Sequence, residues 1–91
     1  MHYVYFLRST KNRRCYVGTT DQLPVTRLKQ HNQGMNDWSK QNGPFVLLYF
    51  ETYHCRTDAI KREHFYKSGF GRRIRDLILR AVSAKGGSAS G

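Results

Sequence analysis

The chain has 91 residues, with 16 Lys and Arg against 6 Asp and Glu, and a formal net charge of +10. This length gives one small domain and leaves no room for a second folded unit. The positive charge favours a polyanionic partner, nucleic acid first and an anionic membrane surface second, because each neutralised phosphate releases counterions. No apolar run approaches the length of a membrane span, and the first residues lack a signal peptide's basic start and apolar core. We therefore expect a cytoplasmic protein that does not enter a membrane.

The two cysteines, Cys15 and Cys55, lie far apart and form no CxxC pair. Neither has a zinc-like arrangement with His54 or His64. We expect two reduced thiols with a structural role; a disulfide between them is the alternative.

The first strand is expected at residues 2–8, which are apolar and aromatic at both odd and even positions. Such a strand is covered on both faces and is therefore central in its sheet. A turn at residues 9–12 would return the chain as a second strand at 13–19. This turn places Tyr5 directly opposite Tyr16 on one face, whereas a loop longer or shorter by one residue would separate them.

A helix is expected at residues 23–33, because Asp21 and Gln22 precede Pro24, which suits a first helical turn. Gly34 is a natural end for this helix. Arg27 and His31 are four residues apart, so they lie on one face of the helix. A tyrosine from the end of the preceding strand can lie near both.

The second half of the chain predicts one more strand and two more helices. Residues 35–43 are polar and loop-like with one turn around Trp38, and Pro44 opens the strongest strand, at 45–53. A helix at 57–67 would have Thr57 as its cap. After a turn at 68–71, a basic amphipathic helix begins at Arg72. Residues 83–91 are rich in Ser, Gly and Ala, so we expect a folded domain at 1–82 and a flexible tail at 83–91.

Glu63 lies on the face of its helix that should point toward the body of the domain, since it is three residues from Ile60 and from Tyr66. An ionised carboxylate there is costly to desolvate unless a cation pairs with it. One such partner is a basic side chain in a salt bridge, most simply Arg27. The other is a divalent metal ion, because magnesium is commonly held by one carboxylate, waters and a substrate phosphate.

Five ordered motifs resemble the GIY-YIG nuclease superfamily, and they cover about residues 2–80. Within it, the small single-domain proteins similar to the catalytic module of the bacterial UvrC excision nuclease are the most similar, because residues 67–73 also match their ending. The motifs are Tyr3-Val4-Tyr5, Tyr16-Val17-Gly18, Arg27-Leu28-Lys29-Gln30-His31-Asn32, Pro44-Phe45-Val46-Leu47-Leu48-Tyr49 and Lys61-Arg62-Glu63-His64-Phe65.

The resemblance implies an α+β fold, with a three-stranded antiparallel sheet flanked by about three helices in the order ββαβαα. It also implies a metal-dependent DNA endonuclease, with Mg²⁺ as cofactor and Mn²⁺ able to substitute. The implied metal ligand is Glu63, and with the resemblance this interpretation is favoured over the salt bridge. The implied catalytic residues are Tyr5, Tyr16, Arg27, His31 and Glu63.

The proposed reaction is in-line attack by a tyrosine-activated water. Such a reaction needs a nucleophilic water, compensation for charge on the phosphoryl oxygens and help for the departing 3′ oxygen. Arg27 can fork onto phosphate oxygens, and His31 can accept the tyrosine proton. The sequence leaves the choice of tyrosine open, with a slight preference for Tyr16 over Tyr5.

Nucleic acid is the expected partner, held by basic residues at Arg13, Arg14, Lys29, Arg72, Arg73 and Arg75. Trp38 and Phe70 either stack on an exposed base or pack inside the protein, and packing is favoured. Branched and single-stranded DNA are candidate substrates, RNA stays open because the attack does not use the 2′ hydroxyl, and a partner protein is a further route to targeting. The alternative function is a catalytically silent nucleic-acid-binding module. A third is an accessory that docks to a larger repair or recombination protein.

Overall fold

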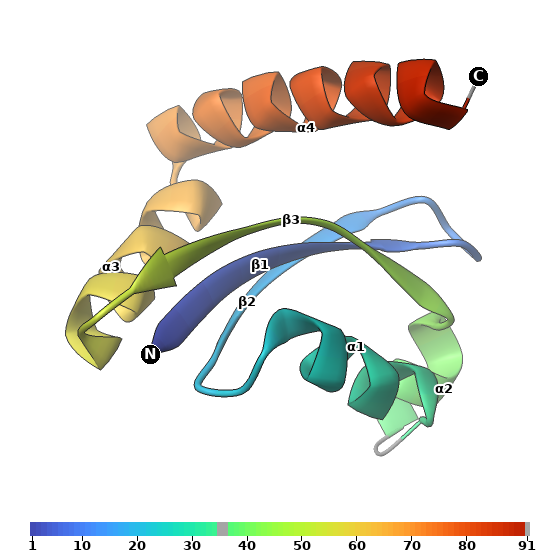
Figure 1. Ribbon diagram of the computed structural model, residues 1–91, viewed down its shortest axis with the longest axis horizontal. Coiled ribbons are helices and arrows are strands. Elements are labelled where there is room, and N and C mark those ends of the chain that lie inside the picture. The colour runs from blue at the N-terminus through green and yellow to red at the C-terminus, as the bar shows by residue number, and fades with distance from the viewer. Residues whose placement is uncertain (35–36, 91) are drawn as a thin grey trace.

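The computed structural model describes residues 1–34 and 37–90, with the side chains of 1–34 and 37–82. The described chain forms an antiparallel sheet with strand order β2-β1-β3, with helices on both faces (Figure 1). This confirms the α+β fold and the central position of the first strand. The elements are β1 (His2–Ser9), β2 (Cys15–Thr20), α1 (Pro24–Asn32), α2 (Asp37–Asn42), β3 (Phe45–Tyr53), α3 (Arg56–Lys67) and α4 (Gly69–Ser90).

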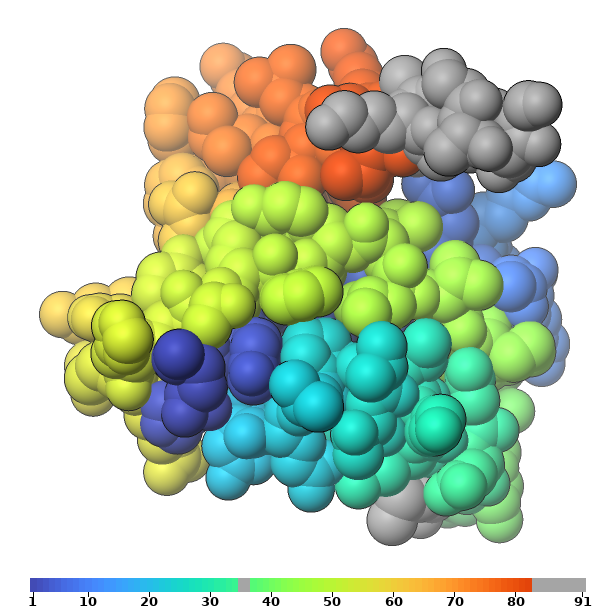
Figure 2. Space-filling view, in the orientation of Figure 1, coloured from blue at the N-terminus to red at the C-terminus, as the bar shows by residue number. Residues whose placement is uncertain are grey.

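Two small cores form because β1 is buried on both faces. Val4 and Phe6 pack with residues of α3 on one face. Tyr5 and Leu7 pack with Phe45 on the other face, which α1 and α2 cover (Figure 1). The two outer strands remain edges, and Figure 2 shows β3 at the surface between α1 and α4. Among the described residues no helix is both long and apolar enough to span a membrane.

The register of β1 and β2 differs from the predicted one. Tyr5 pairs with Gly18, and Tyr16 pairs with Leu7. β1 runs one residue further than expected, because the buried Ser9 still pairs and its N–H donates to the Arg14 carbonyl at 3.0 Å. When the centre of the turn moves by one residue, each residue of β1 faces a residue of β2 that is two positions further along, so Tyr5 faces Gly18 instead of Tyr16. Direct pairing of Tyr5 with Tyr16 was therefore wrong, but the two side chains still share a face, as neighbours on a diagonal.

Helix boundaries supply the other corrections. The loop expected around Trp38 contains the short helix α2, and residues 35–36 lie outside the described part of the chain. Gly34 ends α1 with a φ of 67°, as predicted for a helix stop. The cap of α3 is Cys55 rather than Thr57. Both cysteines are free, as expected.

The junction of α3 and α4 is tighter than the turn predicted at residues 68–71. α4 begins at Gly69 rather than at Arg72, and the Ser68 hydroxyl accepts the Gly71 N–H at 3.3 Å. A Cβ on Gly71 would lie 1.6 Å from the Phe65 carbonyl oxygen, so only glycine fits where the two helices meet. The tail predicted at 83–91 falls where side chains are outside the description, and it stays a prediction.

A partly buried carboxylate, Glu51, fastens α3 to the sheet. The hydroxyls of Tyr49, Tyr53 and Tyr66 all donate to Glu51, and the Nε of Arg62 lies 3.4 Å from its Oε1. Burial alone would raise the pKa of Glu51, but the three hydrogen bonds and the Arg62 charge outweigh it and hold that pKa below its usual value. Burial and the bond to Glu51 raise the pKa of Tyr66 to about 12. The network fixes the position of the helix that carries Glu63.

Candidate active site

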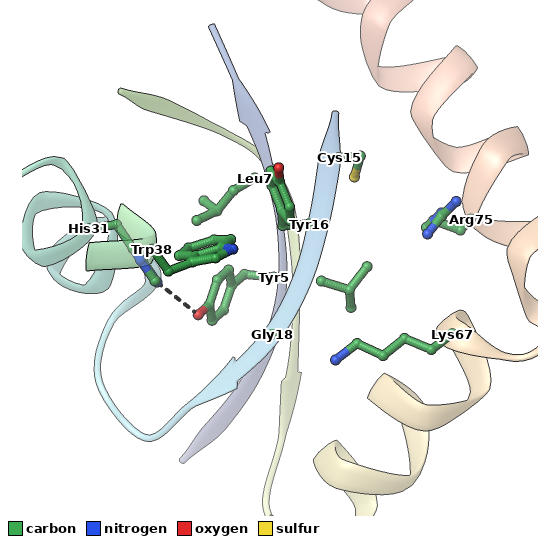
Figure 3. Close-up of a pocket in the computed structure, with 10 residues that line it drawn as sticks. Tyr5, Leu7, Cys15, Tyr16, Gly18, His31, Trp38, Lys67 and Arg75 are labelled. Carbon is green, nitrogen blue, oxygen red and sulfur yellow. Dashed lines mark hydrogen bonds between the residues drawn. The ribbon is translucent and has the colours of Figure 1, made fainter. Parts of the chain in front are cut away.

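A cleft of about 310 Å³ runs along the edge strand β2. Its lining residues come from both faces of the sheet (Figure 3). They include Tyr5, Tyr16, His31 and Trp38 on one side of β2, and Lys67 and Arg75 on the other. Two predicted tyrosines and the predicted histidine thus line one cavity.

A hydrogen-bonded chain leads from the cleft into the domain. The Tyr5 hydroxyl lies 3.3 Å from His31 Nε2, and His31 Nδ1 lies 3.3 Å from the Ser39 hydroxyl. Burial, and then the charge of Arg27, lower the pKa of His31 below its ordinary value, so the imidazole is neutral at pH 7. In the tautomer with its proton on Nδ1, His31 accepts a hydrogen bond from the Tyr5 hydroxyl at Nε2.

The phenol of Tyr5 responds to both predicted charged residues. Burial raises the pKa of Tyr5, Arg27 opposes the rise through a hydrogen bond and its charge, and the Glu63 carboxylate adds to it. Arg27 comes from α1 and Glu63 from α3, so segments on opposite faces of the sheet act on one hydroxyl group. This phenol is where the electrostatic influences of the predicted site meet.

Tyr16 has a different environment. Its hydroxyl donates to Asn42 Oδ1 at 3.2 Å and accepts from Asn12 Nδ2 at 3.1 Å. Its ring meets Trp38 edge-on, with centroids 4.9 Å apart. These two amides and the Trp38 ring fix the position of the Tyr16 side chain.

The salt bridge considered between Arg27 and Glu63 is not found among the described residues. Arg27 Nη1 donates to Gln30 Oε1 at 2.9 Å. Glu63 Oε2 instead lies 3.3 Å from Lys67 Nζ, one turn later on the same helix. Glu63 therefore forms an ion pair with a different partner from the one predicted, and the metal interpretation of Glu63 stays a prediction.

Glu63 suits a metal that takes few ligands from protein. Nowhere in the described part of the chain do three His, Cys, Asp or Glu residues gather as a metal site. A single carboxylate fits Mg²⁺, which keeps several waters and takes further oxygens from a substrate phosphate. A metal ion at Glu63 would take the place that the Lys67 ammonium group holds in this structure.

Of the six basic residues predicted to bind nucleic acid, Arg75 lines the cleft. The others are exposed on three elements: Arg13 and Arg14 on the β1–β2 loop, Lys29 on α1, and Arg72 and Arg73 on α4. Their role stays a prediction.

Sequence reasoning missed several residues of the site. Lys67 could have been found from its spacing of four after Glu63, which makes it a neighbour on the helix surface. Asn12 and Asn42 gave no signal, because a hydrogen bond across 30 residues depends on the fold.

The two aromatic residues considered for base stacking both pack on other rings and stay partly exposed. Trp38 packs on Phe45, with rings 5.2 Å apart and 14° from parallel, and is still 40% exposed. Phe70 packs edge-on against Phe65 and is 67% exposed.

Comparison with known proteins agrees with this geometry. The model of the GIY-YIG catalytic domain matches residues 1–75, which include every predicted catalytic residue. UPF0213 protein CPE1444 of Clostridium perfringens is 34% identical over 86 residues, covering 93% of this chain and 86% of the relative. UPF0213 protein SH2523 of Staphylococcus haemolyticus is 32% identical over 68 residues, covering 74% and 80%. No solved structure gives a significant match. The chain belongs to the GIY-YIG catalytic domain family, which is a nuclease family.

Proposed function

We propose that the cleft hydrolyses phosphodiester bonds of DNA, with Mg²⁺ bound at Glu63 and Mn²⁺ able to replace it. The observation that supports this function best is the environment of Tyr5. Its phenol is hydrogen-bonded to a neutral imidazole and influenced by Arg27 and Glu63, in a chain of a nuclease family. RNA is a second candidate substrate, since the attack needs no 2′ hydroxyl.

Tyr5 is the better candidate for activating water, although the sequence slightly favoured Tyr16. A raised pKa keeps Tyr5 protonated in the resting protein, so it must give up its proton as it takes one from water. His31 Nε2 lies 3.3 Å away to receive that proton. In the described part of the chain the Tyr16 hydroxyl donates to the Asn42 amide oxygen, which is not a base, so Tyr16 serves to position the water or the phosphate.

Charge stabilisation is divided between the two faces of the sheet. Arg27 stabilises the phenolate character of Tyr5 and the negative charge that grows on the phosphoryl oxygens. When bound at Glu63, Mg²⁺ would supply a Lewis acid for the departing 3′ oxygen. The Glu51 network holds α3, and therefore Glu63, in place on the sheet.

A cleavage panel tests this function. Flayed, branched, single-stranded and duplex DNA, with an RNA of matched sequence, are incubated with the protein in Mg²⁺, in Mn²⁺ and with a chelator. We expect metal-dependent cleavage of at least one substrate, with Tyr5→Phe slower than Tyr16→Phe. Intact substrates under every metal condition would reject the nuclease proposal.

A catalytically silent nucleic-acid-binding module is the second candidate. The ion pair between Lys67 and Glu63 favours it, because a carboxylate already paired with a cation does not require a metal. Such a module would bind nucleic acid with a steep salt dependence and leave it uncut. The same panel, combined with a binding titration, separates the two functions.

A further inference from the structure

The cleft passes around the outer edge of β2 instead of staying on one face. Gly18 and Tyr16 line it from the face of α1 and α2, whereas Cys15 and Val17 line it from the face of α3 and α4. β2 is an edge strand, so a ligand can cross it. The Tyr5 phenol lies over Gly18, so a chain that crosses this edge passes the phenol and can touch both walls of the cleft.

The two walls differ in chemistry. The wall near Tyr5 is aromatic and contains the neutral His31, whereas the opposite wall presents Lys67 and Arg75 (Figure 3). A cationic wall beside a site for one phosphate suits a ligand with several phosphates in a row. A nucleic-acid strand carries phosphates at regular spacing along its length, whereas a nucleoside monophosphate carries one.

Arg75 has an unused hydrogen-bond donor. Its Nε is buried, and the described residues offer it no hydrogen-bond partner. Its ion pair, Nη2 to Asp76 Oδ1 at 3.6 Å, joins sequence neighbours, and the Asp76 side chain is 58% exposed. A buried donor without an acceptor is costly, and a phosphate oxygen would supply the acceptor with the geometry that a guanidinium prefers.

Lys67 can leave its present partner at small cost. It pairs with Glu63 at 3.3 Å across one helical turn, and its side chain is 52% exposed. Helical pairs of this spacing contribute little to stability, and solvent screens the Lys67 end, although the Glu63 side chain is only 17% exposed. A divalent ion on Glu63 would repel the ammonium group and free it for another anion.

We propose that Lys67 and Arg75 form a phosphate-binding subsite for the substrate strand, separate from the phosphate that is attacked beside Tyr5 and Arg27. Lys67 turns to this subsite when a metal ion takes its place on Glu63. The subsite rests on the proposed function for the identity of its ligand, a nucleic-acid strand, but it requires no cleavage.

Binding of a labelled single-stranded DNA oligonucleotide at several salt concentrations tests the subsite. Calcium replaces magnesium, and gel analysis verifies that the oligonucleotide stays intact. We expect Lys67→Gln and Arg75→Gln each to reduce the slope of log affinity against log salt by about 0.7, the value for one lost phosphate contact on a single strand. Arg75→Lys keeps the charge and should keep the slope. Lys61→Gln removes an exposed charge from α3, the helix of Lys67, at a position outside the cleft. The salt slope of this variant should equal that of the parent.

Equal slopes for Lys67→Gln and Lys61→Gln would overturn the subsite. Manganese binding without nucleic acid, measured by electron paramagnetic resonance, tests the release of Lys67. Lys67→Gln should bind Mn²⁺ about threefold to tenfold more tightly than the parent, because a competing positive charge is gone. An unchanged affinity contradicts the release. If only the nuclease proposal fails, the variants still show the expected changes in salt slope, but the parent protein cleaves no nucleic acid.

Discussion

Gly18 lies directly opposite Tyr5 in the β1–β2 ladder, and a Cβ on Gly18 would stand 2.6 Å from the Tyr5 hydroxyl oxygen and 2.8 Å from Cζ. The absence of a side chain at Gly18 is therefore what allows the Tyr5 phenol to lie over β2 and reach His31. This glycine is needed for space, and its φ is not in the left-handed region.

Gly18→Ala should displace the Tyr5 ring and slow cleavage by roughly tenfold to a hundredfold, the usual cost of moving a reacting group by about an ångström. Single-turnover cleavage rates measure the effect. Gly69→Ala is the matched control, because a Cβ at Gly69 meets nothing within 4 Å. Equal rates for Gly18→Ala and the parent would show that Tyr5 does not act from this position.

The dependence of cleavage on pH should report His31. The imidazole must be neutral to accept a proton, and burial and Arg27 lower its pKa. The rate should therefore hold down to the ordinary histidine pKa of about 6.5 and fall only below it. His31→Gln should be slower and should lose this acidic limb. An acidic limb that persists in His31→Gln would assign it to another group.

Glu51→Gln should lower the free energy of unfolding by about 2 kcal/mol, since three partly buried tyrosine hydroxyls lose a charged acceptor. The folded pKa of Glu51 is lowered, so its contribution is full above the ordinary value of about 4.5 and is lost as pH falls through the lowered value. The pKa of Tyr66 is raised, so its contribution is full below pH 10 and is lost as pH rises toward about 12.

Chemical denaturation at several pH values measures both limbs of this stability profile. Asp58→Asn, which changes an exposed carboxylate at the start of α3, should leave the profile nearly unchanged. A Glu51→Gln protein as stable as Asp58→Asn would show that the network does not hold α3.

Gly71→Ala should destabilise the protein by about 3 kcal/mol, because its Cβ would overlap the Phe65 carbonyl and force α4 away from α3. Gly69→Ala, two residues earlier, should change stability by no more than about 0.5 kcal/mol. Thermal and chemical unfolding of the pair compare the two glycines directly. Similar free energies of unfolding for Gly71→Ala and Gly69→Ala would mean that the α3–α4 junction rearranges without loss of stability.

The sequence predicted the sheet well, because β1 and β3 are long apolar runs whose pattern needs little context. It placed Tyr5 and Tyr16 on one face even though the register was wrong, since a shift of two residues preserves the face. It missed α2, because a polar helix of six residues has no apolar stripe to detect. The partner of Glu63 and the amides around Tyr16 depend on distances that exist only after folding.

The central claim, that Glu63 holds the metal for phosphodiester cleavage, is tested most directly by comparing Glu63→Gln with Asp58→Asn in single-turnover cleavage at saturating Mg²⁺. Both substitutions remove one negative charge from α3, but only Glu63 influences the Tyr5 phenol. We predict that Glu63→Gln loses at least about a hundredfold in rate, as expected when charge stabilisation at the reacting phosphate is removed, while Asp58→Asn keeps the parent rate. Equal rates for the two variants would contradict the claim.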